Sequence, residues 1–145
     1  MRFFAPDGRL VVADGLRGLL AVTPAGEVQV LAQEADGRPI GLADDVAVAR
    51  DGRIFFTDAS AKFGAREYGV EWASHLDLLE HGGHGRLLVF EPGPNRARTL
   101  VEGLQFANGV ALSPDQRFLL VAETGAFRIL RYWVDGSRPE PLEVL

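Results

Sequence analysis

The 145-residue sequence has no cysteine and only one lysine, Lys62. Without cysteine it can form no disulfide framework, no thiolate zinc site and no cysteine nucleophile. Its apolar runs, such as Phe118–Ala122, are strand-sized and far below the ~18 residues of a membrane-spanning helix. We therefore expect no membrane partner. No signal-peptide pattern is evident near the first residues, which favours a cytoplasmic location.

Basic residues are also in short supply. Fifteen basic side chains stand against twenty acidic ones, which gives a formal net charge of -5. Because such a surface repels a phosphate backbone, nucleic acid is not an expected partner. The glycines are scattered rather than gathered in a phosphate-binding loop. A Gly-x-Ser-x-Gly elbow for serine hydrolysis is absent around each of Ser60, Ser74, Ser113 and Ser137.

One pattern of turn, apolar strand and acid occurs three times, in Pro6–Asp14, Arg50–Asp58 and Pro114–Glu123. The first two turn aspartates lie 51 − 7 = 44 residues apart and the last two 115 − 51 = 64, so a 20-residue insertion in a 44-residue period relates them. A repeat of about 40–45 residues made of short strands is typical of β-propeller blades. Asp-Gly between apolar runs also predicts a β-hairpin in the first two units.

The repeat predicts an all-β fold: a partial, three-bladed β-propeller of four-stranded antiparallel blades at about 1–40, 41–104 and 105–145. The insertion spans 59–85 in the middle blade and is expected to form a short amphipathic helix. The predicted strands of the middle blade are Asp45–Ala49, Arg53–Asp58, Arg86–Phe90 and Ala97–Val101. Those of the third blade are Gly109–Ser113, Arg117–Glu123, Phe127–Val134 and a strand near Pro141–Leu145.

The start of each blade's first strand should face the central channel of such a fold. Counting back seven residues from the turn aspartates gives Asn108 and Asp44. The hairpins should bring Asp58 close to Asp45, and Glu123 close to Asn108. Asp45, Asp58 and Glu123 would then lie behind the two candidate ligands, Asp44 and Asn108. Hard oxygen donors of this kind suit Ca²⁺. The alternative is that the acids are solvated turn residues and that Asn108 only forms a turn.

The insertion is predicted to cover the channel mouth as a lid that carries Tyr68, Trp72 and His75. Trp72, Leu76 and Leu79 recur at helical spacing, and we expect Trp72 and Leu76 to face inward.

Histidines offer a second chemistry in and after this insertion. His81 and His84, expected to be more exposed than Trp72, could chelate a transition metal, but no third ligand is evident. A histidine on a lid could also act as a general base, whereas the alternative is a solvated loop residue. Asp45, His81 and His84 are the candidate catalytic groups, and the sequence assigns no role to any of them.

Six motifs together resemble the strictosidine synthase-like β-propellers, including the adipocyte plasma membrane-associated protein group, and more remotely the gluconolactonase/senescence marker and paraoxonase families. The motifs are Asp44–Val48, Asp51–Ser60, Gly85–Leu88, Phe106–Ser113, Val121–Thr124 and Arg128–Trp133. The resemblance implies a six-bladed ring of about twice this length, of which this chain looks like the second, third and fourth blades.

The resemblance also implies site residues. In calcium-dependent relatives the amide of an Asn-Gly motif, here Asn108, is a metal ligand. An Asn-Asp pair contributes a ligand or a substrate contact in the preceding blade. Here that pair reads Asp44-Asp45, so an acid replaces the amide. The glutamate that serves the condensation in true strictosidine synthases belongs to a later blade, so that activity is not expected.

Two functions follow from the resemblance. One is a calcium-assisted hydrolase of small lactones or esters, in which the metal polarises the carbonyl and stabilises the oxyanion once the ring is complete. The other is a non-catalytic half-propeller that binds a small molecule or has a structural role.

A three-bladed arc leaves two ends with exposed strand edges and blade faces, which invites pairing with another chain. We therefore predict a homodimer in which two copies, head to tail about a two-fold axis, close a six-bladed ring. Light scattering should return about twice the 15.7 kDa of the chain. A cooperatively folded sample with the monomer mass would exclude the ring. The rival hypothesis is a piece of a longer protein, which predicts aggregation-prone material.

Overall fold

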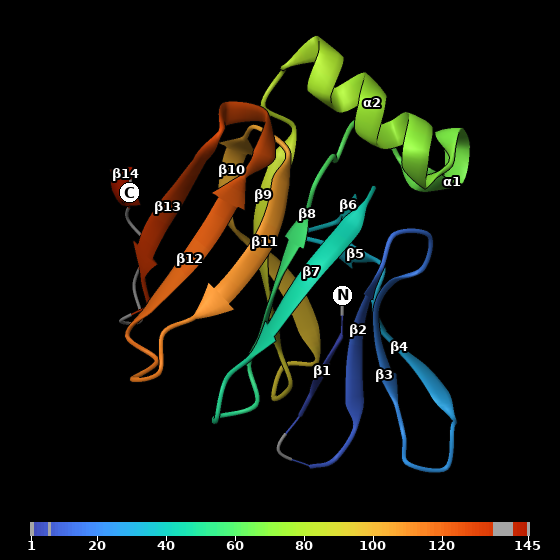
Figure 1. Cartoon of the computed structure of the whole chain (residues 1–145). Helices are drawn as coiled ribbons and strands as arrows, with labels where there is room; N and C mark the ends of the chain where they lie inside the picture. The colour runs from blue at the N-terminus through green and yellow to red at the C-terminus, as the bar shows by residue number, and fades with distance from the viewer. Residues whose placement is uncertain (1, 6, 135–140, 145) are drawn as a thin grey trace.

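Three four-stranded antiparallel sheets follow one another along the chain in the computed structural model, which describes residues 2–5, 7–134 and 141–144 (Figure 1). The first sheet contains β1 (Arg2–Phe4), β2 (Leu10–Asp14), β3 (Gly18–Val22) and β4 (Val28–Ala32). The second contains β7 (Ala43–Val48), β8 (Ile54–Asp58), β9 (Gly85–Glu91) and β10 (Arg96–Leu104). The third contains β11 (Ala107–Leu112), β12 (Phe118–Glu123), β13 (Arg128–Trp133) and β14 (Pro141–Val144).

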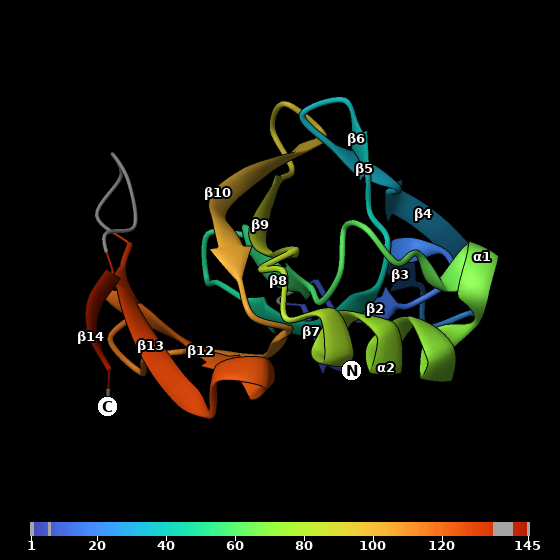
Figure 2. The same cartoon turned by 90° about the horizontal axis from the view of Figure 1, so that it is seen from above.

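Smaller elements lie between and within these sheets. A hairpin of β5 (Glu34–Ala35) and β6 (Arg38–Pro39) joins the first sheet to the second. Helices α1 (Ala65–Tyr68) and α2 (Val70–Glu80) form the insertion between β8 and β9, and a 3₁₀ turn, η1 (Thr124–Ala126), precedes β13. Figure 2 shows both helices over the sheets when the molecule is seen from above. None of the helices in the described part of the chain is long and apolar enough to cross a membrane.

The repeated Asp-Gly-Arg triplets form the tight turns between the first two strands of the first and second sheets. Asp51 Oδ1 accepts a hydrogen bond from Arg53 N (3.0 Å), and its Oδ2 accepts one from Arg53 Nε (2.7 Å). Asp7 and Arg9 make the same pair of bonds, at 3.1 and 2.7 Å. The intervening glycine adopts a positive φ in both turns, which glycine does without steric cost. The same three residues therefore define the same turn in both units.

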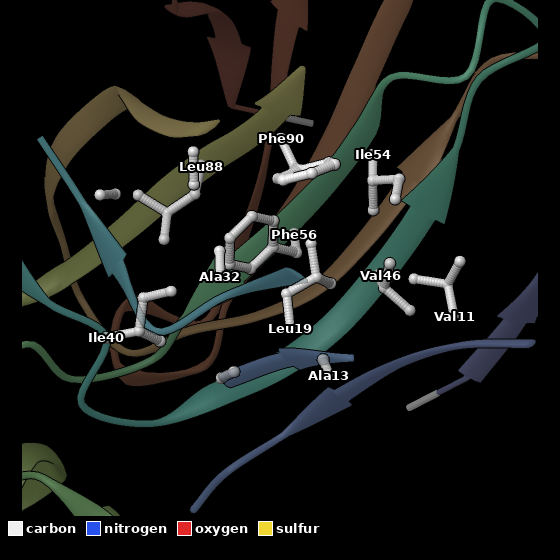
Figure 3. Packing of buried hydrophobic residues seen from close by; sticks show 13 residues of the cluster. Val11, Ala13, Leu19, Ala32, Ile40, Val46, Ile54, Phe56, Leu88 and Phe90 are labelled. Atoms are coloured by element: carbon white, nitrogen blue, oxygen red, sulfur yellow. The ribbon is translucent and has the colours of Figure 1, made fainter. Parts of the chain in front are cut away.

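The middle sheet is buried on both faces because side chains of β8 and β9 alternate between two clusters. Phe56 and Leu88 point to the first sheet and pack with residues such as Leu19 (Figure 3). Phe55 and Leu87, on the opposite face, pack with residues of the third sheet. Every residue of β8 is buried, whereas β2 alternates buried and half-buried positions. The sheets therefore stack face to face, as blades of a propeller do.

The structure confirms the predicted fold class: antiparallel four-stranded sheets that form about half of a six-bladed propeller, with a short helix in mid-chain. The β5–β6 hairpin was not predicted. Its segment combines a charged, glycine-containing turn with strands of only two residues, too short for a hydrophobic period to show.

Substitution of either middle-sheet phenylalanine should destabilise the fold. Phe55→Ala and Phe56→Ala each remove a ring that is at most 1% exposed, and each should cost about 3–5 kcal/mol in the free energy of unfolding. Leu79→Ala is the matched control, because its side chain is 82% exposed, and it should change stability by less than about 0.5 kcal/mol. Urea titration followed by circular dichroism measures all three. Equal losses in the three variants would contradict the two-faced core.

Candidate functional site

Buried polar contacts fix the second sheet to the inner strand of the third. Asp45 is 5% exposed, and its Oδ2 accepts a hydrogen bond from Val110 N at 2.9 Å. Thr57 Oγ1 accepts from Asp45 N (3.1 Å) and donates to the carbonyl oxygen of Asn108 (2.5 Å). These contacts join β7 and β8 to β11, and we call them the inter-blade lock. They set the register of β7 against β11.

The inter-blade lock brings the starts of β7 and β11 together, and these starts carry Asp44 and Asn108. Asp44 directly precedes the locked Asp45, and the carbonyl of Asn108 is itself part of the lock. Both residues are half-buried, and the two strands lie side by side (Figure 1). Burial raises the pKa of the Asp44 carboxyl, and the neighbouring Asp45 raises it further. The arrangement thus places two oxygen donors on adjacent inner strands.

Asp58 ends β8 and pairs with Ala43 at the start of β7, and both its oxygens are used within the protein. Oδ1 accepts from the backbone N–H groups that precede β7, at 3.1 and 2.8 Å, and Oδ2 accepts from Arg86 Nε (3.0 Å) and Nη2 (2.5 Å). Both side chains of this ion pair are almost completely buried. Asp58 therefore anchors the entry to β7.

Glu123 repeats this arrangement in the third sheet. Its Oε1 accepts from Gln105 N at 2.7 Å, and its Oε2 accepts from Arg128 Nε at 2.5 Å. The hydrogen bond to Glu123 raises the pKa of the exposed Arg128 guanidinium. The structure thus shows both Asp58 and Glu123 holding the loop before an inner strand. A role for them behind a metal ligand stays a prediction.

Sequence reasoning missed Arg86, Arg128 and Thr57. A signal for the arginines was available, because an arginine is the first or second residue of the third strand in the second and third units, directly across from the acid that ends the second strand. The first sheet has Gly18 at this place, across from Asp14. Thr57 had no such signal, since its partner comes from a different unit of the repeat.

A metal would find part of a ligand set here. Among residues 2–5, 7–134 and 141–144, no three or more His, Cys, Asp or Glu side chains gather in a way that could hold a metal ion. Asp44 and Asn108 are a carboxylate and an amide, the oxygen donors that Ca²⁺ prefers, but the ion takes six to eight oxygens. The described residues therefore fit calcium as a partial site that needs further oxygens.

The insertion lies at the same end of the sheets as Asp44 and Asn108. It leaves β8 after Asp58, beside the start of β7, and its helices rise above that end (Figure 1). Ala65 and Ala73 pack there with Leu42 and Phe106, each of which shortly precedes an inner strand. The location agrees with a lid, but gating stays a prediction.

The expectation that Trp72 faces inward is wrong. Trp72 is 66% exposed, and the face of α2 that turns inward carries Ala73 and Asp77. Ala73 packs there with Ala59, Ala65 and Phe106. Asp77 is hydrogen-bonded to Ser60, while burial raises the pKa of its carboxyl. The inward face of the helix therefore carries a small apolar residue and a buried acid rather than the tryptophan.

The remaining lid and catalytic candidates lie in varied surroundings. Tyr68 and His75 are exposed, and the His75 ring stands edge-on to Trp72 at 6.0 Å. His81 is exposed as well, whereas His84 is half-buried with its Nε2 3.5 Å from Glu80 Oε2. Asp45 belongs to the inter-blade lock, as described above. Catalytic roles for Asp45, His81 and His84 stay predictions.

Consecutive four-stranded meanders stacked face to face define a β-propeller, and comparison with solved structures supports this class. A gluconolactonase of Xanthomonas campestris superposes with a TM-score of 0.77 and 26% identity, over 98% of this chain and 46% of that one. A regucalcin of Agrobacterium tumefaciens superposes with a TM-score of 0.65 and 17% identity, over 97% of this chain and 43% of that one.

The sequence comparisons then give the family. The family model described as strictosidine synthase matches residues 44–137. Protein STRICTOSIDINE SYNTHASE-LIKE 13 of Arabidopsis thaliana is 39% identical over 147 residues, which cover 100% of this chain and 35% of that protein. The chain belongs to the strictosidine synthase family. It spans about a third of this curated relative and just under half of the solved propellers.

The buried ion pair yields a stability prediction. Arg86→Met should cost about 3–5 kcal/mol in the free energy of unfolding, because it leaves the Asp58 carboxylate buried without its cation. Arg53→Met breaks the exposed pair with Asp51 and should cost less than about 1 kcal/mol. Urea unfolding compares the two variants. The anchoring role of Arg86 is refuted if both lose the same stability.

Proposed function

We propose that the chain is part of a calcium-assisted hydrolase of small lactones or esters, active when the propeller ring is complete. The observation that carries the proposal is the inter-blade lock, which fixes Asp45, directly after Asp44, and the backbone of Asn108 at the starts of adjacent inner strands. The gluconolactonase likeness supports the substrate class, and the regucalcin, named as a calcium-binding protein, supports the metal.

The residues of this chain contribute position and charge. Asp44 and Asn108 present oxygen ligands, and Asp45 keeps them in place through its bond to Val110. The insertion, packed through Ala73, limits access of water to this end. When bound, calcium would polarise a substrate carbonyl and stabilise the developing oxyanion.

Calcium should also relieve the charge on Asp44. Because the pKa of this carboxyl is raised above 3.8 in the folded state, the folded state binds more protons than the unfolded state between the two pKa values. The stability that protonated Asp44 contributes below pH 3.8 is therefore lost as the pH rises through the pKa of Asp44 in the folded state. A nearby cation lowers this pKa and so restores the lost stability.

Thermal unfolding with and without calcium tests the metal site. Calcium should raise the melting temperature of the parent chain by mass action, and EDTA should remove the rise. Asn108→Ala and Asp44→Ala should each lose most of it, because each removes an oxygen donor. Glu27→Gln, which removes an exposed charge from the loop before β4, should keep it in full. If Asn108→Ala shows the parent's calcium-induced shift, Asn108 is not a ligand.

Hydrolysis of gluconolactone by the protein with its ring complete tests the activity. The rate should depend on calcium, and Asp44→Ala should lower it together with the calcium-induced thermal shift. The second candidate function is a non-catalytic half-propeller, favoured by the way Asp45, Asp58 and Glu123 are used inside the fold. It predicts no hydrolysis at any calcium concentration.

We further propose that ring closure comes from a second copy of the chain. Apolar side chains remain exposed on both end sheets: Phe127 and Ile129 beside and on β13, and Val28 and Val30 on β4. Such exposure is a feature of surfaces that pair with another chain. The light-scattering measurement above decides between a ring of two copies and a monomer.

A further inference from the structure

A pocket lies away from the inner strands, at the outer part of the middle sheet. It has a volume of about 360 Å³. The start of β9, the end of β10, the beginning of the insertion and one residue of β6 surround it. Its side chains and backbone come from Arg38, Ala61, Lys62, Gly83, His84, Gly85, Arg86, Glu102 and Gly103. Neither Asp44 nor Asn108 is among its lining residues.

Basic side chains dominate the lining of this outer pocket. Arg38, Lys62 and Arg86 carry positive charges, His84 adds an imidazole, and Glu102 is the one acid among the lining residues. Glu80, outside the lining, forms a solvent-exposed ion pair with Lys62. Arg38 forms an ion pair with Glu102 at the rim, where both side chains are about half exposed. Because that pair is open to water, it holds its partners weakly and leaves the rim free to rearrange around a ligand.

Arg86 supplies the observation that points to a ligand. Its side chain is 2% exposed, and its Nε and Nη2 are bound by Asp58, with Nη2 also donating to the carbonyl oxygen of Pro39 (2.6 Å). Nη1 is buried and has no hydrogen-bond partner. A guanidinium has five N–H donors and no acceptor, and leaving buried donors unsatisfied costs free energy. A ligand oxygen that accepts a hydrogen bond from Nη1 would recover this free energy.

Backbone packing keeps this space open. Gly85 lies so close to the third sheet that a Cβ there would be 2.8 Å from Ala107 N. Gly83 adopts a positive φ and donates its N–H to Gln105 Oε1 at 3.1 Å. A side chain at either glycine would be strained or would meet backbone, so this wall of the pocket is held by main chain rather than filled by side chains.

We propose that this outer pocket binds a small oxyanion, a phosphate or a carboxylate, through Arg86, Lys62 and Arg38. Oxyanions offer the several acceptors that a guanidinium fork and an ammonium group require. The volume is at the lower end of the range for small-ligand pockets, which excludes large ligands. This site is separate from the proposed calcium site and does not depend on it.

Titration of the 145-residue chain with inorganic phosphate, followed by ¹H–¹⁵N NMR at low ionic strength, tests the site. The largest shifts should fall on residues 61–62, 83–86 and 102–103, and added chloride salt should weaken the binding. A parallel titration with acetate distinguishes the two sources of oxyanion: the tighter of the two probes identifies the ligand class. Absence of saturable shifts with both probes would overturn the proposal.

Charge variants at the exposed rim give opposite expected effects. Lys62→Gln should weaken phosphate binding roughly threefold, and Glu102→Gln should strengthen it by a similar factor, as expected for single charges near a surface. Arg98→Gln, on β10 but outside the pocket and paired with Glu91, is the control and should leave affinity unchanged. Equal changes in Lys62→Gln and Arg98→Gln would mean a non-specific effect of net charge and would refute the site. Circular dichroism confirms that each variant is folded.

Discussion

Burial of both faces of the middle sheet is the constraint on which the rest of the structure depends. Successive residues of β8 point to opposite neighbours, so Phe55 and Phe56 each fill a different interface. A strand buried in this way has no solvent-facing side, and its sequence reads as a continuous apolar run. The end sheets each keep one free face and show alternation instead. The order of the sheets, and with it the position of every inner strand, follows from this packing.

Hydrophobic contact alone would not fix the position of one sheet along its neighbour, and polar contacts fix it. The inter-blade lock connects two sheets, whereas the Asp58–Arg86 and Glu123–Arg128 pairs hold the loops that lead into inner strands. In each of these contacts a carboxylate lies near the proposed site, and its oxygens accept hydrogen bonds from groups within the fold. Buried polar groups that are fully paired specify one arrangement. Asp44 and Asn108, at the starts of adjacent inner strands, stay the candidate ligands of the proposed site.

Much of the fold could be predicted from the sequence, because a repeat and an alternating pattern are local signals. The site was harder to predict. The position of Asp58 depends on Arg86, 28 residues later, and the inward face of α2 makes contacts such as that of Asp77 with Ser60, 17 residues earlier. The spacing of Trp72 correctly indicates a helix but not which of its faces turns inward. Partners distant in sequence decide such details, and periodicity does not report them.

The connection between strands also has a consequence for the order of folding. Each sheet pairs strands that follow one another, so most loops to be closed are short and folding within a sheet should be fast. The exception is the β8–β9 pair, which must close around the insertion. Loop-closure entropy grows slowly with length, and helix formation in α2 shortens the free segment. We expect the first sheet to form early and the middle sheet to be completed last. The burial of the middle sheet is complete when the third sheet docks onto Phe55.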